Sequence, residues 1–577
     1  MVTTVVVSES EENFIRVELT RAKPGSIREL MEFIYPGLSS LEGKCPPWPP
    51  DVFAVVATIM RRSGAYVRCI ALNSTGAGAV PFLGTQWPER AEEIGRQWRQ
   101  QIVEILRSRA GQRGKTIRQS LDEVRVPDEV QTEWSLLLGP PSALNLDDSQ
   151  SNLDLCSVLI KLTGYADEAS YNLGFPPFEP NSDPLVQAAS FLLERNGKLS
   201  FCNRIHSNKV RVLAKKHTPQ QGLTLRSMTH HLSLCMPWEV DARWHEIVAN
   251  RHDDILNLLI LPWPLTIDAK AFCQVHGPGA DSLYNEDRLF EYAATATDPS
   301  ALKKKVASVV EKAREKVAKL DALIFPELAL TVAEWQIVEE IAIEQKLLLI
   351  SGITNDVDGA TGRPVNSCRI KLGNVTEPGV TREAYRQAKH HRWCLDRNQV
   401  LQYDLGGQIP GTKRCWENSH VGKREVFFAT IGGWLTFSVL ICEDLARQDP
   451  IAETLRSVGP NLVVALLMDG PQLTSRWSAR YASVLADDPG TSVLTVTSLG
   501  MCSRSHPPGT SPFEPSRTIA LWRDKLYGFR EISLPEKTDA CILSLSFEAR
   551  EEFTADGRSD SKSTQVPVFS GLSFIEE

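Results

Sequence analysis

Hydrophobic and polar positions follow two different patterns along the 577-residue chain. In the first part, apolar residues recur three and four positions apart over residues 51–70 and 89–108, which places them on one face of a helix. From residue 256 onward, short apolar runs of strand length alternate with helical stretches. This change predicts a mainly helical region over residues 1–250, followed by an α/β domain over residues 251–550.

The second region contains two amphipathic segments, 301–320 and 331–345, set among apolar runs. We predict strands at 256–265, 322–327, 347–353, 365–373, 425–431, 435–441, 462–468, 492–498 and 540–546. Strands that alternate with helices are typical of an α/β architecture. Residues 551–577, which include the polar sequence GRSDSKSTQVP, are interpreted as a polar C-terminal tail.

Composition and charge exclude several classes of protein. With 42% hydrophobic residues, 23% charged residues and a formal net charge of −8, the chain has the composition of a globular protein, and its charge does not predict a nucleic-acid partner for the chain as a whole. It lacks both an apolar run of membrane-spanning length and a basic–apolar leader, so we expect neither a membrane span nor a secretory signal. Its 12 cysteines include no CxxC pair, which favours free thiols in a reducing cytoplasm.

One segment, 195–238, departs from this balance, because it contains basic residues and no acid. Its eight Lys and Arg residues are Arg195, Lys198, Arg204, Lys209, Arg211, Lys215, Lys216 and Arg226. Two interpretations stay open: a basic face that docks on the acidic remainder of the chain, or a surface that binds nucleic acid or a protein partner. His230, His231 and Cys235 have loose metal-like spacing but no second ligand pair, so we expect no metal there.

Three reactive side chains lie at strand ends in the second region. Glu327 closes the apolar run ALIFPE, Lys389 lies in YRQAKHHRW, and Cys442 follows LTFSVLI. Strand ends on one edge of an α/β sheet commonly build an active crevice. A helix start directly after Cys442 would favour the thiolate, and Glu443 and Asp444 are expected to cap that helix and to brace the turn.

The order of these residues and their local sequences resemble the nitrilase superfamily of carbon–nitrogen hydrolases, over about residues 255–550. The family's glutamate follows an apolar strand and a proline, as in the sequence FPE that ends at Glu327. Its lysine lies between a tyrosine–basic start and a histidine, as Lys389 does in YRQAKHH, where one or two residues are inserted. Its cysteine ends a strand before an acidic turn, as in ICEDLAR around Cys442. VNSCRI (365–370) is similar to the family's asparagine–serine strand.

The resemblance implies two supporting groups and a fold. Glu417, in CWENS, is similar to a second glutamate of many members and would hold Lys389 and orient Glu327. The backbone N–H of Glu443 would be a second donor to the reacting oxygen. The implied fold is a four-layer α-β-β-α sandwich, which here follows a helical N-terminal domain, and the implied assembly is a homo-oligomer.

The implied activity is hydrolysis of a non-peptide carbon–nitrogen bond in a small amide, ureide or nitrile, without metal or organic cofactor. Glu327 would act as general base, Lys389 would stabilise the oxyanion, and Cys442 would form a thioester. The Cys-Glu-Asp turn also resembles the glutaminase domains of NAD synthetases, but the serine–glycine–glycine loop of their ATP-binding domain does not occur here. The alternative is a catalytically silent metabolite sensor or interaction protein whose basic N-terminal half binds nucleic acid or a protein.

Overall fold

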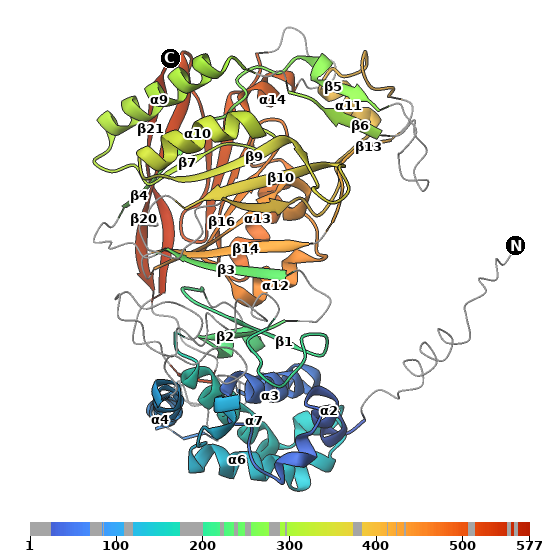
Figure 1. Cartoon of the computed structure of the whole chain (residues 1–577), viewed down its shortest axis with the longest axis vertical. Coiled ribbons are helices and arrows are strands. Elements are labelled where there is room, and N and C mark those ends of the chain that lie inside the picture. The colour runs from blue at the N-terminus through green and yellow to red at the C-terminus, as the bar shows by residue number, and fades with distance from the viewer. Residues whose placement is uncertain are drawn as a thin grey trace, which may run out of the picture.

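Two parts follow one another along the chain, a helical part and a β-sandwich (Figure 1). The computed structural model describes residues 25–69, 83–84, 86–108, 119–172, 200–219, 224–235, 241–247, 255–275, 289–294, 297–372, 384–411, 414–422, 424–431, 434–505, 514–550, 556–558 and 564–577. Among the helices in these ranges, none combines the length and the apolar character that a membrane crossing requires.

The N-terminal part is a set of α-helices around one apolar core. Its helices are α2 (Ile27–Ile34), α3 (Pro49–Ser63), α4 (Trp87–Ser108), α6 (Asp128–Leu138) and α7 (Leu153–Ala169). Gly95 lets α4 approach α7, since a Cβ there would lie 2.3 Å from Cβ of Glu168. Two short antiparallel strands, β1 (Arg211–Ala214) and β2 (Leu232–Cys235), pack on the same core and were not expected from the sequence.

The second part contains two large β-sheets that face each other. The first sheet has the order β11-β10-β9-β7-β4-β20-β21, with β8 beside β9. Its strands are β4 (Ile255–Ile260), β7 (Ala322–Ile324), β8 (Leu330–Thr331), β9 (Leu348–Val357), β10 (Pro364–Lys371), β11 (Tyr385–Ala388), β20 (Thr538–Arg550) and β21 (Thr564–Glu576). The second sheet has the order β19-β18-β17-β16-β15-β14-β3. Its strands are β3 (Asp241–Ile247), β14 (Glu425–Ile431), β15 (Leu435–Ile441), β16 (Leu462–Leu466), β17 (Ser492–Val496), β18 (Thr518–Asp524) and β19 (Gly528–Ser533).

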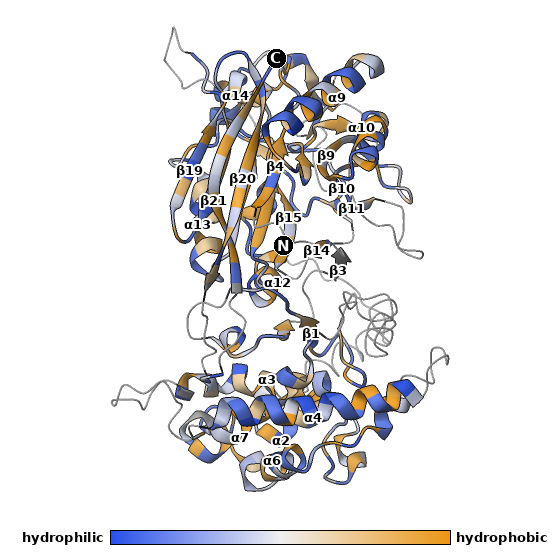
Figure 2. Cartoon of the chain, turned by 90° about the vertical axis from the view of Figure 1, so that its left-hand side faces the viewer, coloured by the Kyte–Doolittle hydropathy of each residue, from blue (hydrophilic) through white to orange (hydrophobic). Residues whose placement is uncertain are grey.

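Helices cover the outer faces of the two sheets and complete the predicted four-layer α-β-β-α sandwich, which the structure confirms. Helices α9 (Pro299–Lys316) and α10 (Val332–Glu344) pack on the first sheet, and α12 (Ile451–Val458) and α13 (Trp477–Asp487) on the second. The sequence sets their starts: Asp298 caps α9 before a proline, and Thr331 and Glu334 form a capping box on α10. Figure 2 shows hydrophobic residues gathered on the strands and hydrophilic ones along α9.

Smaller elements complete the sandwich domain. A four-stranded sheet of order β12-β13-β6-β5 lies beside the two large sheets. It consists of β5 (Phe272–Gln274), β6 (Leu289–Tyr292), β12 (Cys394–Leu395) and β13 (Cys415–Glu417). The short helices α11 (Arg397–Gln402) and α14 (Leu499–Arg504) accompany it. Aromatic residues of this region form a separate core, which includes Phe272, Phe290, Trp393 and Tyr403.

The interpretation of residues 551–577 as a polar tail is wrong. Strand β21 pairs antiparallel with β20 along nearly its whole length, and Val566, Val568 and Ile575 are buried. The apolar residues of β21 alternate only weakly and a polar sequence precedes the strand, so the pattern did not predict it. The strand forms because it pairs with β20 in a long β-hairpin. The helical region is also shorter than predicted, since residues 241–247 form β3, an edge strand of the second sheet.

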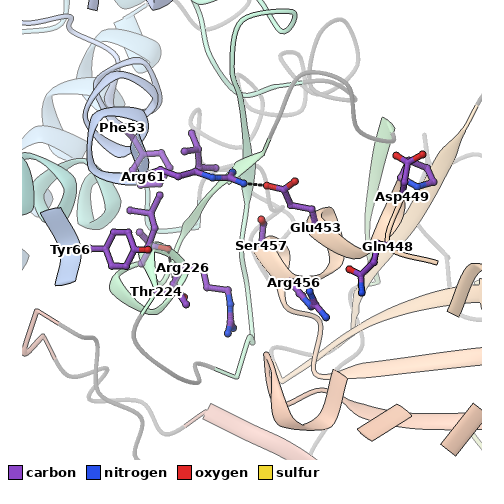
Figure 3. A pocket seen from close by; sticks show the side chains of 14 residues that line it. Phe53, Arg61, Tyr66, Thr224, Arg226, Gln448, Asp449, Glu453, Arg456 and Ser457 are labelled. Carbon is purple, nitrogen blue, oxygen red and sulfur yellow. Dashed lines mark hydrogen bonds and ion pairs between the residues drawn. The ribbon is translucent and has the colours of Figure 1, made fainter. Parts of the chain in front are cut away.

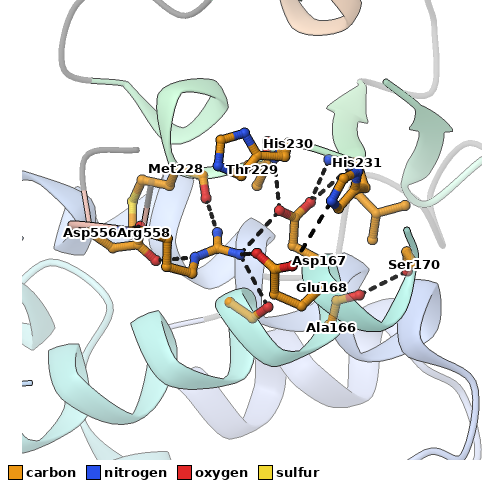
Figure 4. A network of polar contacts seen from close by, with 12 residues as sticks. Ala166, Asp167, Glu168, Ser170, Met228, Thr229, His230, His231, Asp556 and Arg558 are labelled. Atoms are coloured by element: carbon orange, nitrogen blue, oxygen red, sulfur yellow. Dashed lines mark hydrogen bonds and ion pairs between the residues drawn. The ribbon is translucent and has the colours of Figure 1, made fainter. Parts of the chain in front are cut away.

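Residues 556–558, which come between β20 and β21 in the sequence, contribute to a buried ion cluster of the helical part (Figure 4). Arg558, which is 2% exposed, donates hydrogen bonds to Asp556 at 2.7 Å, to Glu168 at 2.6 Å and to the carbonyl of Met228 at 2.5 Å. It also lies 3.3 Å from Asp167. Three carboxylates thus surround one guanidinium, and the C-terminal hairpin is fastened to the N-terminal helices.

Asp167 extends this cluster to the strand pair beside the helices. Its carboxylate accepts hydrogen bonds from the backbone N–H groups of His230, His231 and Leu232 at 2.7, 2.9 and 2.9 Å. Burial alone would raise the pKa of Asp167, but Arg558, the two histidines and these donors lower it. At Glu168, the effect of burial outweighs that of Arg558, and the pKa is raised to about 7.

The basic residues of segment 195–238 make contacts within the chain. Nζ of Lys215, a buried side chain, donates to the carbonyls of Arg226 and Thr229 at 2.8 Å each. Arg226 itself forms an ion pair with Asp488 of the sandwich. Further contacts are Arg204 with Asp122 and Lys209 over the ring of Phe33, whereas Arg195 and Lys198 lie outside the described residues. These contacts support the interpretation as an internal docking face.

Replacing Arg558 with alanine is expected to lower the free energy of unfolding by about 3–5 kcal/mol, because Asp167, Glu168 and Asp556 would lose their buried cation. Urea denaturation followed by circular dichroism measures this loss. The control, Arg480→Ala on the exposed face of α13, is expected to cost less than about 0.5 kcal/mol. A loss in Arg558→Ala no larger than that of the control would contradict a structural role for the cluster.

Candidate active site

The four predicted side chains lie at the ends of four different strands, and all four are buried. Glu327 follows β7, Lys389 follows β11, Glu417 ends β13 and Cys442 follows β15. Their exposed fractions are 2%, 2%, 7% and 4%. Glu327 and Lys389 come from the first sheet and Cys442 from the second, so the group lies where the ends of the two facing sheets meet.

Gly352 determines how closely the Glu327 turn packs on the first sheet. A Cβ at Gly352 of β9 would lie 2.4 Å from the backbone nitrogen of Leu328 and 2.5 Å from Cα of Glu327. The backbone of Gly352 also donates a 2.9 Å hydrogen bond to the carbonyl of Pro326. A glycine is therefore needed there for β9 to hold the glutamate in place.

One ammonium group lies between two carboxylates. Nζ of Lys389 is 2.8 Å from Oε1 of Glu327 and 2.9 Å from Oε2 of Glu417. The side-chain amide of Asn366 donates to Oε1 of Glu327 at 2.7 Å and to Oε1 of Glu417 at 2.6 Å. The backbone N–H of Trp393 donates to Glu417 at 3.0 Å. Each of the two carboxylates is thus held by both the lysine and the asparagine.

Burial and charge act against each other on these groups. Burial alone would lower the pKa of Lys389, but Glu327, Glu417 and Cys442 raise it well above its usual value, so the ammonium stays protonated. At Glu327, burial raises the pKa, Lys389 opposes this and Glu417 adds to it, and the net shift is upward. The group is therefore a charged lysine next to a carboxylate that accepts a proton more readily than an ordinary glutamate.

Cys442 has a strained backbone and a protonated thiol. Its φ of 45° lies in the left-handed region, which non-glycine residues rarely adopt and which is common at functional turns. Burial, followed by the charge of Glu327, raises the pKa of the thiol well above its usual value, and Lys389 opposes this only in part. The thiol is consequently neutral near pH 7.

The expectation that a helix start activates Cys442 is wrong. The residues after the strand form only a short 3-10 helix, η10 (Cys442–Leu445), and the α-helix that follows, α12, begins six residues later at Ile451. A single short turn has no macrodipole comparable with that of an α-helix. Activation of the thiol must therefore come from the side chains around it.

Asp444 braces the turn across to the lysine loop instead of capping a helix. It is 1% exposed and accepts hydrogen bonds from the backbone N–H of His390 at 3.0 Å and from Nδ1 of His391 at 3.0 Å. Glu443 pairs on the outer side with Arg447 at 2.9 Å. The turn that carries Cys442 and the loop that carries Lys389 are thus joined by one buried carboxylate.

Two further groups were not predicted as site residues. Asn366 lies in the VNSCRI strand, whose resemblance to an asparagine–serine strand was the available signal. Asp469 follows the predicted strand 462–468, and its charge acts on the Cys442 thiol. Its carboxylate accepts hydrogen bonds from Tyr403 and Arg476 at 2.5 Å each, and from Trp477 at 2.9 Å. The strand-end argument used for Glu327 would have singled out Asp469 as well.

No family model matches the chain, and no curated protein matches its sequence. Solved structures from the nitrilase superfamily are similar to about half of it. Nit3 of Saccharomyces cerevisiae, a member of branch 10 of that superfamily, is 12% identical, with 51% of this chain and 91% of that chain covered and a TM-score of 0.32. An amidase from Nesterenkonia sp. is 12% identical, with 54% and 94% covered and a TM-score of 0.32.

A glutamine-dependent NAD+ synthetase from Acinetobacter baumannii is 13% identical, with a TM-score of 0.30. The match covers 55% of this chain and 48% of that chain. Identities and TM-scores this low transfer neither residue roles nor substrates, so the function of the site has to be argued from its own geometry.

Replacing Lys389 with methionine is expected to lower the free energy of unfolding by about 3–5 kcal/mol near neutral pH, because two buried carboxylates would lose their cation. The raised pKa of Glu327 would rise further. A carboxyl with a raised folded-state pKa stabilises the fold below its unfolded-state pKa, and this contribution is lost as the pH rises through the folded-state pKa. The deficit should therefore be smaller at about pH 5 than at about pH 7.5.

Urea denaturation at both pH values, with the wild type measured alongside, checks this expectation. Lys316→Met, at an exposed position at the end of α9, is the matched control and should show little loss at either pH. A deficit in Lys389→Met that is independent of pH would contradict the electrostatic explanation.

Proposed function

We propose that the chain is a thiol-dependent hydrolase of a non-peptide carbon–nitrogen bond in a small amide, ureide or nitrile. One observation carries the proposal: a carboxylate, an ammonium and a thiol that lie far apart in the sequence, each at the end of a strand, are buried and interact electrostatically with one another. Lys389 lies 2.8 Å from Glu327, and the charges of both act on the Cys442 thiol. The resemblance of the Glu, Lys and Cys motifs to the nitrilase superfamily supports it.

Glu327 is suited to the role of general base. Its Oε1 accepts from Lys389 and Asn366, whereas Oε2 is buried and has no hydrogen-bond partner in the described part of the chain. The thiol of Cys442 is neutral and must lose its proton as sulfur attacks. In the proposed first step on an amide or ureide, Sγ bonds to the substrate carbon, the thiol proton moves to Oε2 of Glu327, and the carbonyl oxygen becomes an oxyanion; on a nitrile, the charge develops on nitrogen instead.

Lys389 is suited to stabilise that oxyanion. Two of its three ammonium protons are directed to Glu327 and Glu417, which leaves one for the reacting oxygen. A donor fixed in place by two carboxylates needs no reorganisation when the negative charge develops. The backbone N–H of Glu443, directly after the nucleophile, is proposed as the second donor.

The remaining steps return the enzyme to its starting state. The carbon–nitrogen bond breaks as protonated Glu327 gives its proton to the departing ammonia or amine, which leaves a thioester on Cys442. Water then loses a proton to Glu327 and attacks the thioester, and sulfur leaves as the thiol once it regains that proton. Glu417 takes no proton in this sequence; it positions Lys389 and shares Asn366 with Glu327.

All of the groups named come from one chain, so this chemistry requires no second copy and no cofactor. The homo-oligomer and the cytoplasmic location inferred at the outset stay predictions. The silent-sensor alternative has less support, because the described basic residues of segment 195–238 make contacts inside the chain.

Replacing Cys442 with alanine is expected to reduce ammonia release at least about a thousandfold, because the thioester could no longer form. The measurement is ammonia release from a panel of small amides, ureides and nitriles, with intact-mass analysis of quenched wild type to detect the acyl adduct. Cys541→Ala, a buried cysteine on β20, is the matched control and should retain activity. Equal turnover by wild type and Cys442→Ala would reject the proposal.

The rate should also depend on pH in a defined direction. Glu327 must be deprotonated to act as base, so kcat/KM is expected to rise with pH through its pKa, which burial raises above the usual 4.5. Because the pKa of the Cys442 thiol is raised above 9.0, alkylation of the free enzyme by iodoacetamide should be slow at pH 7. An acid limb at or below about 4.5, or rapid alkylation at neutral pH, would contradict this assignment.

A further inference from the structure

A cavity of about 520 Å³ lies between the helical part and the sandwich, away from the candidate active site (Figure 3). One wall comes from α3 and the segment 224–234 of the helical part. The other comes from residues 448–457, that is, the turn before α12 and the helix itself. None of the proposed catalytic residues lines it. Its size falls within the range of about 300–1,000 Å³ that is usual for small-molecule sites.

The two walls differ in part of their chemistry. The helical part contributes the apolar side chains of Phe53, Tyr66, Leu225 and Leu234 together with Arg61, Thr224, Arg226 and Thr229. The sandwich contributes, apart from Pro450, only polar and charged residues, namely Gln448, Asp449, Glu453, Arg456 and Ser457. Because aromatic side chains line only the helical wall, the apolar body of a ligand would face that wall.

Most charged side chains that line the cavity have an ion-pair partner of opposite charge. Arg61 forms an ion pair with Glu453 across the cavity, and Arg226 pairs with Asp488. Asp449 lies 3.6 Å from Arg424. Each of the two cavity carboxylates therefore has its own arginine.

Arg456 is the exception among the cavity arginines. Its Nε is buried and has no hydrogen-bond partner, and no ion pair reaches its guanidinium in the described part of the chain. A guanidinium presents five N–H donors in a planar fork that matches a carboxylate or a phosphate. The Arg456 side chain is half-buried, so its guanidinium is partly withdrawn from water, and an anion bound there would gain more than it would at a fully solvated arginine.

We propose that this cavity binds a small organic anion that has a planar apolar body and one carboxylate or phosphate group. The anionic group binds Arg456, and the body packs against Tyr66 and Leu225, which are half-buried at the cavity wall. This inference stands independently of the proposed hydrolase activity. A ligand in this position contacts both parts of the chain, so it stabilises their interface by mass action.

Binding can be measured directly with three probes: adenosine monophosphate, benzoate and inorganic phosphate. Isothermal titration calorimetry and thermal unfolding of the full chain report affinity and stabilisation. Adenosine monophosphate or benzoate is expected to bind, and inorganic phosphate at least about tenfold more weakly, because it has no planar body. Which of the two binds more tightly decides between phosphate and carboxylate as the anionic group.

Variants then locate the site. Arg456→Gln should weaken binding at least about tenfold, whereas Arg480→Gln, at an exposed position on α13, should leave it unchanged. Tyr66→Leu should weaken binding of the planar probes but not of inorganic phosphate, a selective effect that a merely misfolded variant would not give. The proposal is overturned if neither planar probe binds the wild type, or if binding is equally strong in Arg456→Gln.

Discussion

The buried ammonium of Lys389 between Glu327 and Glu417 is the interaction on which the candidate site depends. Two carboxylates withdrawn from water cost several kcal/mol each unless a cation compensates them. One lysine can do so only if both carboxylates lie within hydrogen-bonding distance of the same nitrogen, as they do here at 2.8 and 2.9 Å. This requirement fixes the relative positions of β7, β11 and β13, and the charge of the same ammonium acts on the Cys442 thiol.

This arrangement also explains how a thiol can be both unreactive at rest and ready to react. Burial and the charge of Glu327 keep Cys442 protonated, which protects it from oxidation and alkylation. The group that raises its pKa is also the base that would remove its proton, so activation would require only that a bound substrate accept the sulfur. The positive φ of Cys442 and the brace from Asp444 fix the thiol, so little motion would be needed for the attack.

The sequence allowed prediction of features that are encoded locally. Apolar runs such as 435–441 are buried along their whole length and were predicted as strands, and Glu327 and Cys442 follow such runs directly. Lys389 follows the polar strand β11, and the family resemblance was the signal that identified it. The failures involve features that the local pattern of residues does not show. Strand β21 lacks a strong pattern and is stabilised by β20, and the bridging role of Asn366 depends on Glu417, 51 residues away. The capping expected of Glu443 and Asp444 failed because η10 ends before a helix can form.

The interface between the two parts contains two arginines in opposite situations, one buried and one half-buried. Arg558 forms ion pairs with Asp167, Glu168 and Asp556, so it is a structural cation whose charge is fully compensated. Arg456 lies at the same interface with a buried donor that nothing in the described chain satisfies. Most buried polar groups in folded proteins have partners. Arg456 has neither an ion pair nor a partner for Nε in the described residues and lies at the wall of a cavity, so it is the residue at which the proposed anion would bind. The helical part would then do more than cover the sandwich, because it supplies the apolar wall against which that ligand packs.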